Sequence, residues 1–163
     1  MSPAYRHCVG TLGVVLAGSA LVAGCGGSYT KRDFVARADA ICASALRQLR
    51  SIPPPSSSPS AAPPAGAPAG YLATVLAVEQ SQYRQLRALR RPAQDNVGRA
   101  KLTRWLASLT RVVEDYRELA TAAQRGNAEG VSSAEAALRA SPVGSLAASY
   151  GLSSCASPGP TTT

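Results

Sequence analysis

The chain has 163 residues, of which 45% are hydrophobic, and Lys and Arg outnumber Asp and Glu by 17 to 9. This length leaves room for one domain. Ala supplies much of the apolar content and there is one Trp, one Phe and one Met, so we expect a thin, closely packed core. Few stretches alternate β-branched residues with period two, which argues against a sheet. The Arg excess has two explanations: a GC-rich genome or a functional basic surface.

The N-terminal segment has the parts of an export signal. Arg6 and His7 give a weakly basic start, and residues 9–23 then carry no charge. A helix of about 15 residues is roughly 22 Å long, which is too short to cross the ~30 Å hydrocarbon core of a bilayer comfortably. A basic start followed by a short apolar run and small residues is typical of a secretory signal.

The residues that close this run resemble the lipobox of bacterial lipoproteins. Val22-Ala23-Gly24-Cys25 is an aliphatic residue and two small residues before a Cys. The resemblance implies that Cys25 is lipidated, with residues 1–24 removed as the signal peptide and residues 25–30 left as a tether. Two acyl chains suffice for stable attachment, so the expected location is the outer face of the cytoplasmic membrane. The alternative is an uncleaved anchor, or a plain secretory signal with an incidental Cys.

The remaining cysteines then form a pair. Cys8 lies in the signal and Cys25 takes the lipid, which leaves Cys42 and Cys155 in an exported, oxidising compartment. We therefore predict a Cys42–Cys155 disulfide. The alternative, two free thiols that bind a metal, lacks further ligands because the only His is in the signal. No metal or other cofactor is expected.

Apolar residues at three-to-four spacing predict amphipathic helices along the mature chain. The first covers 30–52, with Thr30 and Asp33 spaced as a capping box. Residues 53–70 are rich in Pro, Ser and Ala, which predicts a loop or spacer whose Ser residues could accept O-linked sugars. A second helix is expected over 71–91.

A third helix is predicted over 93–125, with Gly126 as its stop, and a fourth over 128–140 after Asn127 as a cap. A short fifth piece follows over 142–150, and residues 156–163 read as a disordered tail. The sequence thus predicts an all-α domain over 31–155, an antiparallel bundle of about four helices with a Pro-rich linker between the first two.

This pattern resembles a loose group of small, uncharacterised actinobacterial lipoproteins and secreted proteins. The residues that carry the resemblance are FVARADAIC at 34–42, the LRAL segment at 86–89 before Pro92, and GLSSC at 151–155. The resemblance implies an envelope-attached helical domain with one disulfide. It implies no activity.

Little in the sequence points to catalysis, and we expect no enzyme. The mature chain has no His, so Ser/His and Cys/His arrangements are excluded. Glu114, Asp115 and Glu118 are interleaved with Arg111 and Arg117, which favours a solvated, salt-bridged face over a carboxylate dyad. Glu129 and Glu135 form a second acidic pair, and no Gly-rich phosphate loop is present.

The function expected first is a non-catalytic interaction or binding module, anchored through Cys25 and facing an envelope protein partner. The alternative is a binder of anionic lipid headgroups or wall polymer, because without Arg6 the mature chain has 16 basic and 9 acidic residues. Guanidinium groups pair well with phosphate. The candidate anion-binding cluster on the second helix is Arg84, Arg87, Arg90 and Arg91.

A solvated helix flank is the simpler explanation of this cluster. Nucleic acid is a poor candidate partner, because an exported compartment contains little of it. Trp105 and Tyr116 stand at core spacing, which favours packing over a stacking platform. The sequence does not indicate an oligomeric state.

Overall fold

The computed structural model describes residues 29–53, 67–93 and 95–157. Several sequence predictions lie outside these residues: the signal over 1–24, the lipidated Cys25, residues 54–66 of the Pro-rich segment, and most of the tail. At residues 67–70 the predicted loop is wrong, because the second helix already begins at Ala67 instead of residue 71. Within the described ranges the chain is helical, with no strand. The predicted all-α class is confirmed.

Six helices follow one another in the part of the chain that the structure describes. Their bounds are α1 Lys31–Ser51, α2 Ala67–Ala88, α3 Asn96–Gln124, α4 Ala128–Ala140, α5 Val143–Tyr150 and α6 Ser153–Ala156. The predicted ranges for α1, α4 and α5 agree to within one residue at each end. The four-residue α6 was not predicted, and it ends one residue inside the predicted tail.

The connection between α2 and α3 is longer than the sequence predicted. The second helix ends at Ala88 instead of Arg91, because a residue before Pro92 is disfavoured in helical conformation. The third begins at Asn96 instead of residue 93, since the side chain of Asp95 accepts a hydrogen bond from the Gly98 amide and caps the helix there. Arg90, Arg91 and Pro92 therefore lie in the segment that connects α2 to α3.

Other predicted helix ends are confirmed. Thr30 and Asp33 form the capping box at the start of α1. The side chain of Asn127 accepts a hydrogen bond from the Gly130 amide and caps α4. Gly126 has a φ of 65°, the left-handed conformation that closes a helix and that side chains with a Cβ rarely adopt.

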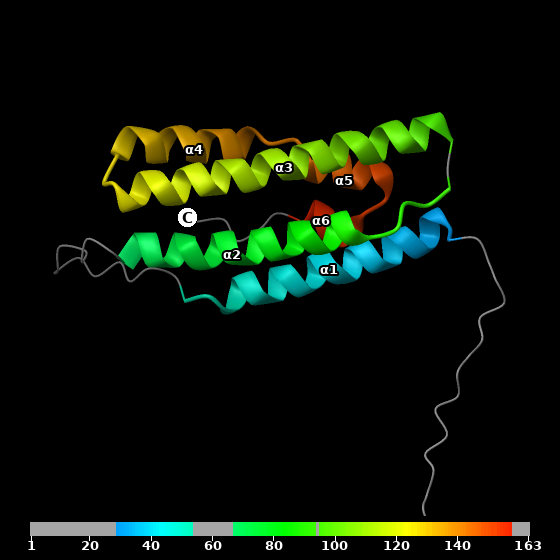
Figure 1. The fold of residues 1–163 in the computed structure, drawn as a ribbon, viewed down its shortest axis with the longest axis horizontal. Coiled ribbons are helices and arrows are strands. Elements are labelled where there is room, and N and C mark those ends of the chain that lie inside the picture. Colours follow the sequence, from blue (N-terminus) through cyan, green and yellow to red (C-terminus); the bar gives the residue numbers. More distant parts are fainter. Residues whose placement is uncertain (1–28, 54–66, 94, 158–163) are drawn as a thin grey trace, which may run out of the picture.

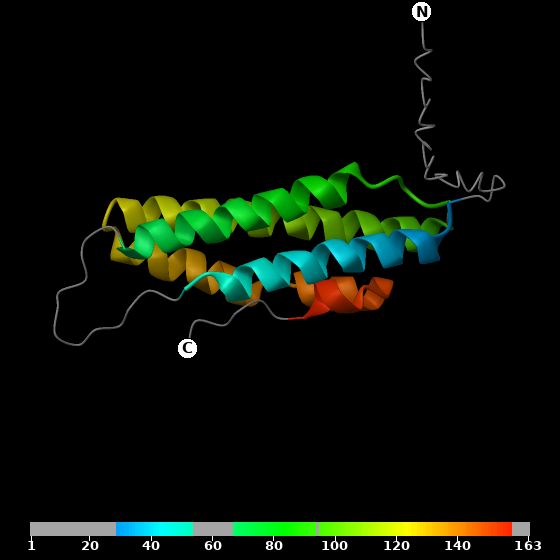
Figure 2. The same cartoon turned by 90° about the horizontal axis from the view of Figure 1, so that it is seen from below.

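The longest helix, α3, is the centre of the bundle (Figure 1). It packs against α2, α4 and α5, while α1 packs against α2 and α6. Figure 2 shows α1 beside α2, with α6 beside α1, while α5 packs against both α3 and α6. In both views the start of α1, the α2–α3 connection and the start of α3 lie at the same end of the molecule.

Aromatic side chains fill the core near that end. Phe34, Trp105 and Tyr150 are completely buried, and the rings of Phe34 and Tyr150 meet edge to face with 5.9 Å between centroids. The prediction that Trp105 packs in the core is confirmed. None of the helices in the described ranges has the length and apolar character needed to cross a bilayer.

The predicted disulfide joins the two ends of the domain. Cys42 of α1 is bonded to Cys155 of α6, with 5.1 Å between the Cα atoms. The carboxylate of Asp39, one turn before Cys42, accepts hydrogen bonds from the amides of Ser153 and Ser154 at 3.2 and 2.8 Å. Asp39 thus caps α6 from another helix, and the bond and the cap together hold the C-terminal segment on α1.

Candidate functional site

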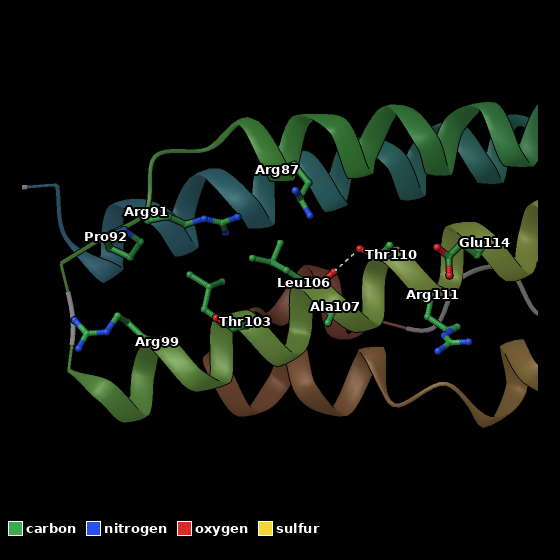
Figure 3. Close-up of a pocket in the computed structure, with 11 residues that line it drawn as sticks. Arg87, Arg91, Pro92, Arg99, Thr103, Leu106, Ala107, Thr110, Arg111 and Glu114 are labelled. Atoms are coloured by element: carbon green, nitrogen blue, oxygen red, sulfur yellow. Dashed lines mark hydrogen bonds between the residues drawn. The ribbon is translucent and has the colours of Figure 1, made fainter.

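An arginine-rich groove runs between the end of α2 and the first half of α3 (Figure 3). Its volume is about 630 Å³. Four arginines line it, together with one carboxylate, Glu114, and hydroxyl and apolar side chains of α3. The lining residues are Arg87, Arg91, Pro92, Arg99, Leu102, Thr103, Leu106, Ala107, Thr110, Arg111 and Glu114.

A chain of hydrogen bonds positions Arg87 on one side of the groove. Its guanidinium donates to the hydroxyl of Tyr83 at 3.2 Å, and that hydroxyl lies 3.0 Å from the hydroxyl of Thr110 on α3. Thr110 in turn donates to the carbonyl of Leu106 at 3.1 Å. Because Thr110 has a single hydroxyl proton, Tyr83 must donate to it. These hydrogen bonds therefore all run in one direction, from Arg87 to α3. They link the guanidinium group of Arg87 to α3.

Arg91 lies further along the same wall, in the connection after α2. Burial lowers the pKa of Arg91, and the neighbouring positive charge of Arg87 lowers it further, while Tyr150 acts in the opposite direction. Two guanidinium groups that repel each other in a partly desolvated position gain energy from an anion between them. The side chain of Pro92 is buried next to them and holds the connection in place.

The wall formed by α3 carries the other two arginines. Figure 3 shows Arg99 and Arg111 near opposite ends of this wall, with Thr103, Leu106 and Ala107 between them. The side chain of Arg99 donates a hydrogen bond to the amide oxygen of Asn96. The positive charges thus surround a floor that is partly apolar, since Leu102 and Leu106 are core residues whose edges reach the groove.

The structure brings together only part of the predicted Arg cluster. Arg87 and Arg91 line the groove, whereas Arg84 and Arg90 do not. The guanidinium of Arg90 instead stacks over the ring of Tyr29, 5.8 Å from its centroid. Arg84 is exposed on α2.

Arg99 and Arg111 also line the groove, although neither belongs to the arginine cluster predicted from the sequence. The signal that could have found them is the spacing of groove residues on α3, where 99, 103, 106, 110 and 114 recur every three or four positions. Residues at this spacing share one helix face. A short connection makes consecutive helices antiparallel neighbours, so one face of α3 was expected next to α2, but the spacing alone does not say which face.

A half-buried carboxyl group, that of Glu79, lies near the middle of α2. Burial raises the pKa of Glu79 to about 7, from an ordinary value of 4.5. Within the described part of the chain, no hydrogen bond or ion pair to Glu79 is found. Across the α2–α3 interface, burial together with the charge of Glu79 raises the pKa of Tyr116 to about 12. The prediction that Tyr116 packs is consistent with its partial burial.

The predicted acidic face divides in two. Asp115 is buried, on the side of α3 that carries Leu119 and Ala122, whereas Glu114 and Glu118 are exposed. In the described part of the chain neither of these glutamates forms an ion pair with Arg111 or Arg117, so the predicted salt bridges are not found there. An ion pair of 3.5 Å does form on α4, between Glu135 and Arg139.

Among the residues that the structure describes, no three His, Cys, Asp or Glu side chains converge as a set that could hold a metal ion. Comparisons of the chain with protein-family models, with curated proteins and with solved structures yield no match.

Proposed function

We propose that this chain is a non-catalytic binding module, held on the outer face of the cytoplasmic membrane by a lipid on Cys25, and that its arginine groove binds an anionic group. The anion is the phosphate of a lipid headgroup or of an anionic wall polymer. One observation carries the proposal: four arginines from α2, α3 and the connection between them line a single groove that contains one carboxylate.

The chemistry of the groove supports a phosphate ligand. Arginine presents several N–H donors in a planar fork that matches phosphate oxygens. Arg87 is held in place by the Tyr83 hydroxyl, so it loses little side-chain freedom when it binds. Burial lowers the pKa of Arg91 and the charge of Arg87 lowers it further, and a negative charge between the two guanidinium groups relieves their repulsion.

The lipid anchor in this proposal is supported by the sequence alone. The Val22-Ala23-Gly24-Cys25 motif follows an uncharged run, as in the signals of the actinobacterial lipoproteins that the chain resembles. Mass spectrometry of the chain from the membrane fraction tests the anchor directly. A Cys25 that carries no acyl group after export would overturn this part of the proposal.

A protein partner in the envelope stays a prediction from the sequence. Of the large hydrophobic side chains in the described ranges, Val97 is the exposed one, with 63% of its surface accessible. No feature of the described surface favours a protein ligand over an anion.

The groove is tested by titrating the purified chain with glycerol phosphate, which contains the group shared by lipid headgroups and phosphate-rich wall polymers. The double variant Arg87→Gln/Arg91→Gln is compared with the charge-matched control Arg84→Gln/Arg47→Gln, whose residues lie outside the groove. A charged hydrogen bond contributes about 1.5 kcal/mol, so the groove variant should bind about 100-fold more weakly. Equal affinities for the two variants would contradict the groove assignment.

A second pair of measurements distinguishes the sources of the phosphate. Binding is measured to phosphatidylglycerol vesicles and to a soluble glycerol phosphate polymer. A groove-dependent signal with vesicles alone assigns the ligand to the lipid, and one with the polymer assigns it to the wall.

A further inference from the structure

The end of the bundle at which α1 and α3 begin is shown in Figures 1 and 2. We call it the basic end, because the elements that meet there carry six basic residues: Lys31, Arg32, Arg90, Arg91, Arg99 and Lys101. All but Lys101 are exposed, and Lys101 is half-buried. These six residues come from α1, from the α2–α3 connection and from the first turns of α3.

The carboxylates at this end are already engaged in the fold. Asp33 accepts hydrogen bonds from the amide and hydroxyl of Thr30 in the capping box. Asp95 accepts one from the amide of Gly98 at the start of α3. They balance two of the six positive charges at most, and each also faces the positive end of a helix dipole. The basic end therefore keeps a net positive charge.

Two lysines of the basic end are held by the C-terminal helices. The ammonium group of Lys31 lies over the ring of Tyr150, 4.6 Å from its centroid. The ammonium group of Lys101 donates a hydrogen bond of 3.4 Å to the carbonyl of Ser149. The cluster is thus built from separate parts of the chain and is not a run of charges on one helix.

The start of the described chain is fixed at this same end. The ring of Tyr29 packs against the core and lies beneath two guanidinium groups, with Arg37 at 5.3 Å and Arg90 at 5.8 Å from its centroid. Cys25 precedes Tyr29 by four residues. Four residues span at most about 14 Å, so a lipid on Cys25 brings this end of the bundle to the membrane.

An exposed apolar side chain completes the surface. Val97, with 63% of its surface accessible, lies in the first turn of α3 between the arginine positions of the connection and Lys101. A small apolar residue surrounded by basic ones suits the boundary between headgroups and acyl chains.

We propose that the basic end is a docking surface for a bilayer that contains anionic phospholipids, and that it holds the bundle end-on against the membrane. This inference rests on the lipid anchor of the proposed function and names the lipid surface as the partner. Arg91 and Arg99 belong to both the groove and the basic end, so end-on docking places one end of the groove next to the headgroups.

The chain contains its own probe for this orientation, because Trp105 is its single tryptophan. Trp105 lies nine residues from the start of α3 and 19 from its end, which is about 14 Å and 29 Å along the helix. Energy transfer from Trp105 to dansyl-labelled headgroups is therefore efficient when the basic end faces the bilayer and weak when the opposite end does.

The experiment uses the chain purified from membranes and reconstituted into vesicles of phosphatidylcholine, with or without phosphatidylglycerol. We expect higher transfer in vesicles that contain phosphatidylglycerol, and a fall to the phosphatidylcholine level in the variant Lys31→Gln/Arg32→Gln/Lys101→Gln. The control Arg47→Gln/Arg50→Gln/Arg125→Gln removes the same charge from the opposite end and should keep the wild-type transfer. Equal transfer in both kinds of vesicle would overturn the proposal, as would equal loss in the two variants.

The contribution of the basic end to membrane binding is measured in the Cys25→Ser chain, which has no site for acylation. In this chain, partition into vesicles depends on the protein surface alone. Each basic residue near an anionic surface contributes about 1 kcal/mol, a factor of about 5 in partition. The basic-end variant should therefore partition about 100-fold less into phosphatidylglycerol vesicles than the control. Circular dichroism confirms that both variants fold.

The outcomes also separate this inference from the proposed function. Lys31, Arg32 and Lys101 lie outside the groove, so their variant should bind soluble glycerol phosphate as the wild type does. If the protein does not bind glycerol phosphate but still docks on vesicles, the proposed anion site in the groove is wrong and the proposed docking surface is supported. If Cys25 proves to carry no lipid, the chain is added to the vesicles directly, and the same comparison is read by co-sedimentation.

Discussion

Replacing Glu79 with Gln should stabilise the protein at neutral pH and leave its stability in acid unchanged. The carboxyl group of Glu79 is half-buried, and this loss of solvent raises its pKa to about 7, whereas the unfolded chain has the ordinary value of 4.5. Between these values the folded protein keeps a proton that the unfolded chain has released. The free energy of unfolding therefore falls as the pH rises from about 4.5 to about 7.

The size of the effect follows from the gap between the two pKa values. A gap from 4.5 to about 7 corresponds to about 3 kcal/mol of stability lost above pH 7. Glutamine has nearly the shape of protonated glutamic acid and does not ionise. The Glu79→Gln protein should therefore match the wild type near pH 4 and exceed its free energy of unfolding by about 3 kcal/mol near pH 8.

Urea unfolding followed by circular dichroism measures this difference, with the disulfide kept oxidised in both proteins. Measurements near pH 4, 5.5 and 8 should give a gap that opens progressively. Glu118→Gln is the matched control, because Glu118 is an exposed glutamate on the neighbouring helix α3. A Glu79→Gln protein no more stable than the wild type near pH 8 would refute the reasoning. A gain that is equal at all three pH values would assign the effect to packing instead of ionisation.

Three further changes test other parts of the structure. Reducing the Cys42–Cys155 bond, whose cysteines are 113 residues apart, should lower the free energy of unfolding by about 4 kcal/mol, measured by urea unfolding with and without reductant. Asp39→Ala leaves the start of α6 without its cap and should cost about 1–2 kcal/mol in the same assay, with Asp39→Asn losing less. Tyr83→Phe removes the acceptor that positions Arg87 and should weaken glycerol phosphate binding about tenfold with little change in melting temperature; an unchanged affinity would contradict the positioning role.

The helical architecture could be predicted from the sequence because its signals are local. The Thr30–Asp33 box, the Asn127 cap and the Gly126 stop each act within a few residues of the helix end that they define. The Cys42–Cys155 pair is a contact between distant residues, yet it could be predicted by elimination once the other two cysteines had been assigned to the signal and the lipid.

The groove could be predicted only in part, because it belongs to an interface between two helices. The density of arginines near the end of the second helix pointed to Arg87 and Arg91, which do line the groove, but it pointed equally to Arg84 and Arg90. Arg84 is exposed on another part of α2, and Arg90 and Arg91 follow the end of the helix at Ala88, so their helical spacing does not hold. The contribution of α3 depends on how the two helices pack, which neither helix encodes by itself.

The environment of Glu79 could not be predicted from the sequence either, because it also depends on how α2 and α3 pack. In the sequence Glu79 stands in a mostly apolar segment as one polar position of an amphipathic helix, where exposure is the ordinary expectation. Its burial comes from α3, whose Tyr116 faces α2 at this level. A shifted pKa is a property of the packed pair of helices, so the sequence of α2 alone could not have revealed it.

The disulfide does more than stabilise the fold, because it also helps to assemble the basic end. The bond and the Asp39 cap hold α6 on α1, and α6 packs against α5, which ends at Tyr150. The ring of Tyr150 supports the ammonium group of Lys31 and contacts Phe34. If the bond is reduced, α5 and α6 lose their attachment and the lysines lose their supports. We therefore expect that reducing the disulfide abolishes docking to vesicles under conditions in which the bundle is still folded.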